Sequence, residues 1–178
     1  MVVMVPPIVV MGVQGAGKST IGSKLAQRLG LVFVDGDRLH SDENVARMAA
    51  GIALTDEERL PWLRDIGRVL SDGRDRGIVV VCSALKRGYR DLLREAAPDV
   101  FVVDPEGPME LIAARISERE HEYMPPDLLQ SQYDILEPLA DNERGVVVDV
   151  RLSPEEIVRV TLDALQHDLT VGRTTRAD

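Results

Sequence analysis

Residues 12–19 read GVQGAGKS and match the glycine-rich pattern G-x-x-x-x-G-K-[ST], which constrains the fold of this chain more strongly than any other feature. A β-branched run at residues 8–11 precedes this loop, and residues 20–29 follow it with apolar side chains at helical spacing. Strand, loop and helix in this order allow backbone N–H groups to turn inward around a phosphate chain, where the helix dipole adds to the attraction. The sequence therefore predicts a P-loop that binds a nucleoside triphosphate.

The positions of this loop have distinct expected roles. Lys18 is expected to reach the β- and γ-phosphates and to act in catalysis, while the hydroxyl of Ser19 is expected to bind Mg²⁺. The alternative, a glycine turn with a purely structural role, is disfavoured by the flanking strand and helix. Nucleotide contacts are expected from Gly12, Val13, Gln14, Gly15, Ala16, Gly17, Lys18, Ser19 and Thr20.

Composition limits the kinds of partner that the chain can bind. The 178 residues carry a net charge of −9 with a pI near 4.9, which argues against nucleic acid and against an anionic membrane as partners. Aromatic residues make up only 3%, too few for base-stacking surfaces. Cys82 is the only cysteine, which rules out an internal disulfide and fits a reducing compartment. We therefore expect one cytoplasmic domain over residues 1–178, with a frayed tail at residues 168–178.

Short β-branched runs alternate with helical patterns along the rest of the chain. Two capping-box sequences, Thr55–Glu58 and Ser153–Glu156, predict helix N-termini, and Pro61 is expected to open the longer helix after the first of them. Further strands are expected at residues 32–34, 78–82, 100–103 and 146–150. Because these runs lack polar alternation, they are typical of parallel strands covered on both faces. The sequence thus predicts an α/β fold, a three-layer parallel sheet of about five strands, with ligands at the carboxyl ends of the strands.

Two carboxylates, Asp35 and Asp37, follow the second predicted strand as Asp-Gly-Asp. On an extended chain residues two apart point the same way, so both are expected at the sheet edge beside the P-loop. Asp35 is then suited to organise Mg²⁺, and Asp37 to accept a proton from a substrate hydroxyl. The alternative is an Asp-Gly turn whose carboxylates are only solvated. Together with the P-loop, and without the N-K-x-D sequence of GTPases, the pattern favours a small-molecule kinase.

Several longer motifs resemble those of the gluconate kinases, and the resemblance extends over residues 8–165. The segments that carry it are DGDRLH at residues 35–40, PWL at 61–63, CSALKRGYRD at 82–91, LLQSQ at 128–132 and LEP at 136–138. The resemblance implies ATP-dependent phosphorylation of D-gluconate at its 6-hydroxyl, with Mg²⁺, on a P-loop NTPase fold of the nucleoside-monophosphate-kinase and shikimate-kinase type. It also implies a cytoplasmic enzyme, often a homodimer. A related kinase of shikimate or another small polyol acid, and a non-catalytic nucleotide-binding regulatory module, remain the alternatives.

Gluconate is a linear polyol with one carboxylate, so its site needs cations and hydrogen-bonding groups. Asp37 is expected to take the proton of the 6-hydroxyl, and Arg59, with Lys86 or Arg90, is expected to bind the sugar acid. His40 is a further candidate for a hydrogen bond to a substrate hydroxyl. Ion pairing on a helix surface is the alternative for the two arginines, and a structural role is the alternative for His40.

A mobile lid is expected at residues 115–130. Arg115 and Arg119 lie four residues apart, on one predicted helix face. They are expected to bind the nucleotide and to bring positive charge to the transferring phosphoryl group. The lid segment as a whole is expected to exclude water from the site. A solvated helix face is the alternative. At residues 121–123 the chain reads HEY, whereas the family carries a Gly-His-Phe-type step. By analogy with this fold, the adenine is expected at the turn of residues 151–154.

Overall fold

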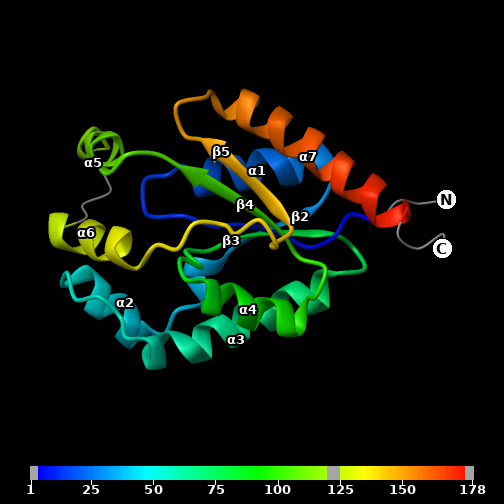
Figure 1. Cartoon of the computed structure of the whole chain (residues 1–178). Coiled ribbons are helices and arrows are strands. Elements are labelled where there is room, and N and C mark those ends of the chain that lie inside the picture. Colours follow the sequence, from blue (N-terminus) through cyan, green and yellow to red (C-terminus); the bar gives the residue numbers. More distant parts are fainter. Residues whose placement is uncertain (1–3, 120–124, 175–178) are drawn as a thin grey trace.

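Five parallel strands form one central sheet in the order β2-β3-β1-β4-β5, and helices cover both of its faces (Figure 1). The structure is a computed structural model that describes residues 4–119 and 125–174. The strands are β1 (Ile8–Val10), β2 (Val32–Asp35), β3 (Ile78–Val81), β4 (Phe101–Glu106) and β5 (Gly145–Asp149). The helices are α1 (Lys18–Leu29), α2 (Asp42–Ala49), α3 (Asp56–Gly73), α4 (Arg87–Ala96), α5 (Met109–Ser117), α6 (Pro126–Ile135) and α7 (Pro154–Thr174), with a short 3₁₀ helix η1 (Gly36–Leu39) after β2. The predicted three-layer parallel α/β fold is therefore confirmed.

Strand β1 lies at the centre of the sheet and places the glycine-rich loop at its carboxyl edge. Val9 is in register with Val80 of β3 on one side and with Val102 of β4 on the other. All three side chains are buried, as expected of a central strand that helices cover on both faces. The carboxyl ends of β1, β3 and β4 therefore meet beside the glycine-rich loop.

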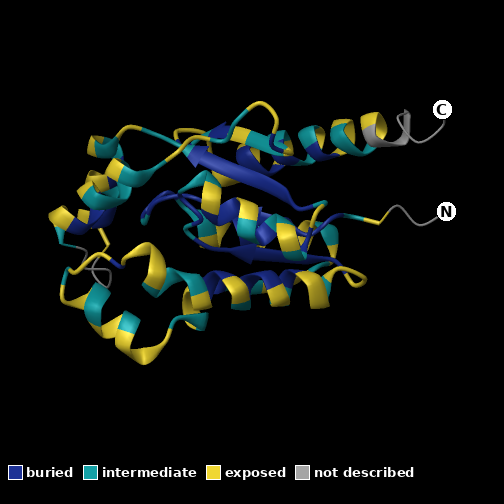
Figure 2. Ribbon diagram, turned by 60° about the horizontal axis from the view of Figure 1, so that its bottom comes forward, coloured by how far each residue is buried: buried dark blue, intermediate teal, exposed yellow. Residues whose placement is uncertain are grey.

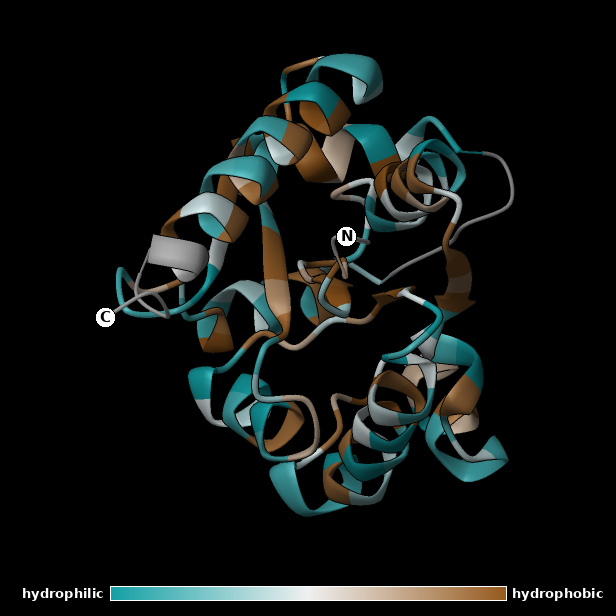
Figure 3. Cartoon of the chain, turned by 90° about the vertical axis from the view of Figure 1, so that its right-hand side faces the viewer, coloured by the Kyte–Doolittle hydropathy of each residue, from teal (hydrophilic) through white to brown (hydrophobic). Residues whose placement is uncertain are grey.

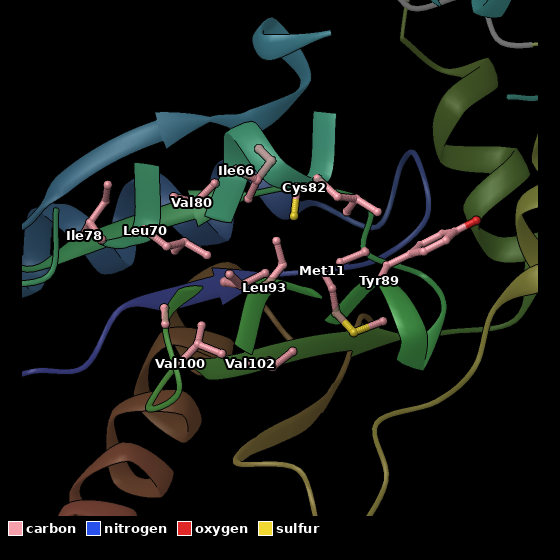
Figure 4. Packing of buried hydrophobic residues seen from close by; sticks show 14 of the residues in the cluster. Met11, Ile66, Leu70, Ile78, Val80, Cys82, Tyr89, Leu93, Val100 and Val102 are labelled. Atoms are coloured by element: carbon pink, nitrogen blue, oxygen red, sulfur yellow. The ribbon is translucent and has the colours of Figure 1, made fainter. Parts of the chain in front are cut away.

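Two hydrophobic clusters, one on each face, hold the helices to the sheet. Helices α1 and α7 pack on one face through residues such as Leu25 and Ile157. Helices α3 and α4 pack on the other face, where Ile66 and Leu93 lie close to Val80 (Figure 4). Strands β1, β3 and β4 are buried in the middle of the molecule, whereas the edge strands β2 and β5 are partly exposed. The exposed, hydrophilic residues of the helices lie on their outer turns (Figures 2 and 3). This pattern accounts for the near-continuous apolar runs in the sequence.

A third cluster lies at the carboxyl edge of the sheet, where α5 and α6 cover the glycine-rich loop. Val13 and Ala16 of the loop pack with Ile112 of α5 and Leu128 of α6. Helix α2 lies near the same end of the molecule (Figure 1) and buries none of its residues. The three helices thus surround the edge at which parallel sheets bind ligands.

Helix α3 begins five residues before Pro61, so the expectation that this proline opens the helix is wrong. Thr55 accepts a hydrogen bond from the Glu58 N–H, and the Glu58 carboxylate accepts one from the Thr55 N–H. This capping box satisfies the first free N–H groups, and α3 therefore starts at Asp56. Pro61 lies in the second turn of the helix, where its ring leaves the carbonyl of Glu57 without the usual helical donor.

Helix α7 continues through most of the segment predicted to be a frayed tail. The Asp168 carboxylate pairs with the Arg144 guanidinium at 2.5 Å, and Leu169 packs against the cluster shared by α1 and α7. These contacts extend the helix to Thr174, while residues 175–178 of the predicted tail lie outside the described residues. Within the described ranges, neither α7 nor any other helix is apolar over a stretch long enough to span a membrane.

Candidate active site

The glycine-rich loop depends on backbone conformations that side chains disfavour. Gly12, Gly15 and Gly17 have φ values of 132°, 82° and 91°, in the region that only glycine adopts readily. A Cβ at Gly15 would also lie 2.7 Å from the Ile116 side chain of α5. Helix α1 begins at Lys18, directly after the last of these glycines. The loop therefore has the strand, turn and helix context that a triphosphate cradle requires.

Lys18 and Asp37 line the same cavity, which has a volume of about 320 Å³. The Lys18 ammonium donates a hydrogen bond of 2.9 Å to the carbonyl of Val13 within the loop. Burial raises the pKa of the Asp37 carboxyl above its ordinary value; the Lys18 charge opposes this rise, and the Asp35 carboxylate adds to it. A carboxylate whose pKa is raised in this way binds a proton more readily, as a general base requires.

Asp35 lines a separate open hollow of about 510 Å³ together with Ser19 and Phe33, whereas Asp37 lines the cavity of Lys18. The expectation that the two carboxylates face the same way assumed an extended chain, but the chain leaves the extended conformation directly after Asp35. The Asp35 side chain caps η1 by accepting a 3.1 Å hydrogen bond from the Asp37 N–H. Gly36 is tightly enclosed, since a Cβ there would lie 2.6 Å from the carbonyl of Val81.

The arrangement of Ser19 and Asp35 fits a magnesium ion bound together with a nucleotide. A hydroxyl and a carboxylate are the hard oxygen ligands that Mg²⁺ prefers, and both line the hollow beside the N-terminus of α1. Among the described residues there is no group of three or more acidic, histidine or cysteine side chains that could hold a metal alone. Phosphate oxygens and waters would therefore complete the coordination of Mg²⁺.

His40 lines the cavity of Lys18 and Asp37, and it also packs against the hydrophobic core. Its ring stacks on Trp62 with a centroid distance of 4.1 Å, and the Trp62 indole donates to the carbonyl of Gly36 at 2.8 Å. Burial, followed by the charge of Arg59, lowers the pKa of His40 to about 4, so the imidazole is neutral near pH 7. The buried Nδ1 atom has no hydrogen-bond partner within the described part of the chain. His40 therefore packs on the core and also lines the cavity.

Arg59 also lines this cavity and is held by a polar network. Its guanidinium donates a 2.8 Å hydrogen bond to the hydroxyl of Tyr89, which in turn donates to the Asp56 carboxylate. Lys86 donates to both oxygens of Asp56 at 3.0 Å and so supports the network from outside the cavity lining. Figure 4 shows the Tyr89 ring at the edge of the core with its hydroxyl pointing away from the packed side chains.

Arg90 is a structural residue, and its expected role in binding the sugar acid is wrong. The side chain is 1% exposed and forms a bidentate ion pair with Glu143, with distances of 2.8 and 2.9 Å. The same guanidinium donates to the carbonyls of Ala84 and Leu85, which stabilises a turn where Ala84 has a φ of 31°. A further bond goes to the carbonyl of Pro138, so all sides of the guanidinium are engaged.

Arg115 and Arg119 do not share one helix face, because α5 ends at Ser117 and Arg119 lies beyond it. The expectation that they form a single helical pair is therefore wrong. Arg115 donates a 2.6 Å hydrogen bond to the carbonyl of Val150, beside the turn where the adenine is expected. The part of the predicted lid at residues 120–124, including His121, lies outside the described residues.

Sequence reasoning assigned no role to three residues that contribute to this cavity. Ser83 and Gln132 line it, and Tyr89 holds Arg59. Ser83 follows β3, so the rule that ligands bind at the carboxyl ends of strands was a usable signal. Gln132 and Tyr89 sit on helices and reach the site through tertiary packing, for which the sequence carries no local signal.

Comparison with known proteins agrees with this geometry. The model of a family described as "AAA domain" matches residues 8–139. A shikimate kinase from Aquifex aeolicus aligns with a TM-score of 0.60 over 91% of this chain and 97% of its own, and its 18% identity shows a shared fold alone. The fold and the glycine-rich loop thus define a P-loop NTPase domain of the small-kinase type.

Two relatives narrow this class. The Arabidopsis thaliana gluconokinase is 43% identical over 180 residues, covering 91% of this chain and 93% of the relative. The crystal structure of a gluconokinase from Sinorhizobium meliloti 1021 is 42% identical, with a TM-score of 0.89 over 97% of this chain and 98% of its own. The chain belongs to the gluconokinase family.

Proposed function

We propose that this protein transfers the γ-phosphoryl group of ATP to the 6-hydroxyl of D-gluconate and forms 6-phospho-D-gluconate. The observation that carries the proposal is the shared cavity of Lys18 and Asp37, which joins a phosphate cradle to a carboxylate whose pKa is raised. Membership of the gluconokinase family supports the choice of acceptor. Arg59 lines the same cavity and supplies a cation for the carboxylate of the sugar acid.

In the proposed reaction, the 6-hydroxyl oxygen bonds to the γ-phosphorus as the bond from that phosphorus to the β–γ bridging oxygen breaks. ADP leaves with that oxygen, and the hydroxyl proton passes to the carboxylate of Asp37. The ammonium of Lys18 stabilises the negative charge on the phosphoryl oxygens. Ser19 and Asp35 would hold Mg²⁺, which would neutralise further phosphate charge. The raised pKa of Asp37 suits it to accept the proton of the hydroxyl.

Acceptor recognition is assigned to the remaining polar groups around the cavity. Arg59 binds the carboxylate of the sugar acid, and Lys86 acts through Asp56 and Tyr89 by fixing the position of that guanidinium. Neutral His40 presents a hydrogen-bonding nitrogen to a hydroxyl. Arg115 and Arg119 are proposed to approach the nucleotide when the lid closes, which would exclude water and suppress ATP hydrolysis.

The direct test measures ADP release with ATP, Mg²⁺ and a panel of acceptors that contains D-gluconate, shikimate and other polyol acids. Release that depends on D-gluconate, with 6-phospho-D-gluconate as the product, supports the proposal. Turnover with a different acid assigns the cavity to the related-kinase alternative. Tight ATP binding without stimulation by any acceptor assigns the protein to the regulatory-module alternative.

We also propose that the protein acts in the cytoplasm as a homodimer, because gluconate kinases often do so. Light scattering coupled to size-exclusion chromatography measures the mass in solution. A mass of about twice 19.6 kDa supports the dimer, and a mass close to 19.6 kDa contradicts it.

A further inference from the structure

Gln132 of α6 bridges the glycine-rich loop and the proposed acceptor cavity. Its side-chain oxygen accepts a 2.8 Å hydrogen bond from the backbone N–H of Gln14, which lies 118 residues earlier in the chain. The Gln132 side chain also lines the cavity that contains Lys18 and Asp37. One amide therefore touches both the element proposed to hold the nucleotide and the space proposed to hold the acceptor.

The bond to Gln14 determines which end of the Gln132 amide remains for a ligand. A backbone N–H can only donate, so the carbonyl Oε1 must face Gln14 and the Nε2 group must point elsewhere. Within the described ranges, Nε2 forms no hydrogen bond, which leaves its donor hydrogens for a ligand. The oxygens of a polyol acid, whether hydroxyl or carboxylate, are acceptors for such a donor.

We propose that Gln132 recognises the acceptor, donating from Nε2 to an oxygen of the bound sugar acid while Oε1 stays on the Gln14 N–H. This inference rests on the proposed function, since it names a further contact of the same acceptor site. The bond to the loop sets the direction of the donor, so the amide is oriented before the acceptor arrives. Such preorganisation lowers the entropic cost of binding.

The replacement Gln132→Glu distinguishes a contact with the acceptor from a purely structural hydrogen bond to the glycine-rich loop. A glutamate can still accept the hydrogen bond from the Gln14 N–H, but its second oxygen replaces the donor and adds negative charge. If Gln132 only braces the loop, this variant keeps the wild-type KM for gluconate. If it donates to the acceptor, the KM for gluconate rises by about tenfold or more, because a donor is lost and an acidic ligand is repelled.

The experiment measures the KM for gluconate and, separately, the Kd for ADP without acceptor. We expect Gln132→Glu to raise the KM for gluconate strongly and to change the Kd for ADP by less than about threefold. This difference is expected of an interaction that is specific to the acceptor. Gln166→Glu is the matched control, since it makes the same charge change at an exposed position of α7 that does not line the cavity, and it should leave both values unchanged. Thermal melting verifies that both variants fold.

The outcomes separate this inference from the proposed function. A wild-type protein without gluconate-dependent ADP release overturns the proposed function and the inference with it. A wild-type protein that turns over gluconate, beside a Gln132→Glu variant with unchanged KM, overturns only the inference. Equal factors of change in the gluconate KM and the ADP Kd would also reject it, since they indicate a general distortion of the loop. A rise in the gluconate KM of Gln132→Glu without a matching change in the ADP Kd supports the inference.

Discussion

At the scale of single residues, the environment of Asp37 differs from that of an ordinary surface carboxylate. It follows a strand end, lies in a cavity with Lys18, and has a neighbouring carboxylate in Asp35. Burial and Asp35 both favour its protonated form, whereas Lys18 favours the charged form. The net effect is a raised pKa, which favours the proposed role of this carboxylate as proton acceptor.

Asp37→Asn is expected to lower kcat by at least ~100-fold while ADP still binds, because the amide keeps the shape but cannot take the proton. Steady-state kinetics with gluconate measure the loss of kcat, and calorimetry with ADP measures whether the nucleotide still binds. Asp72→Asn, an exposed change of the same kind on α3, is the control and should behave as wild type. An Asp37→Asn enzyme with near-normal kcat would leave the carboxylate only an orienting role.

Tyr89→Phe is expected to raise the KM for gluconate by about fivefold with a smaller change in kcat. The ring would still pack in the core, but Arg59 and Asp56 would lose their shared partner, and a typical hydrogen bond contributes about 1 kcal/mol. Tyr133→Phe removes a comparable hydrogen bond, to the carbonyl of Gly107, and serves as the control. An equal effect of the two changes on KM would argue against a specific role of Tyr89 in placing Arg59.

At the scale of elements, Arg90 and Glu143 join α4 to the segment that follows α6. Burial by itself raises the pKa of Glu143, but hydrogen bonds from Arg90, from the Ala140 N–H and from Arg94 lower it to about 2. The carboxylate is therefore charged and well partnered inside the protein. Because Arg90 also holds the turn at Ala84, this pair shapes the loop that carries Ser83 into the cavity.

Arg90→Met is expected to destabilise the fold by about 3–5 kcal/mol, since it leaves a buried carboxylate without its main partner. The double change Arg90→Met with Glu143→Leu should recover much of this loss, because no buried charge then remains unpaired. Urea unfolding of both variants measures the effect. A folded double variant whose gluconate KM has risen more than about tenfold would restore a substrate role to Arg90.

At the scale of the whole molecule, a second cavity of about 420 Å³ lies between the carboxyl ends of β4 and β5 and the chain around α6. Asp104 is 1% exposed there and accepts a 3.1 Å hydrogen bond from the Leu139 N–H. Burial raises the pKa of Asp104 to about 6; the bond from Leu139 opposes this rise, and the Glu106 carboxylate adds to it. Compared with the unfolded chain, the folded protein therefore holds the proton of Asp104 up to a higher pH.

This raised pKa makes the free energy of unfolding depend on pH. The stabilisation from protonated Asp104 is fully present below the unfolded pKa of 3.8 and is lost as pH rises through about 6. Asp104→Asn stays neutral at every pH and should be more stable than wild type at about pH 8, by on the order of 2 kcal/mol. Urea midpoints at about pH 4, 6 and 8 test this. A stability difference that does not change with pH would contradict it.

Local chemistry made several parts of this structure predictable. The glycine-rich loop, the five strand positions and the capping box at residues 55–58 follow from glycine conformation, β-branched runs and hydrogen bonding between near neighbours. Asp35 and Asp37 lie beside the loop, as expected, but the extended chain assumed between them is replaced by a 3₁₀ turn that begins at Gly36. Prediction therefore succeeded wherever the deciding partners lie within a few residues of each other.

The sequence by itself determined the phosphate loop, the order of strands and helices, and the family to which the chain belongs. Only the tertiary structure decided that Arg90 pairs with Glu143, that Tyr89 holds Arg59, and that Gln132 reaches Gln14. These pairs are separated by 53, 30 and 118 residues, and they meet only when helices pack against the sheet. The physical reason is that a buried polar group must find a partner in space, whatever its distance along the chain.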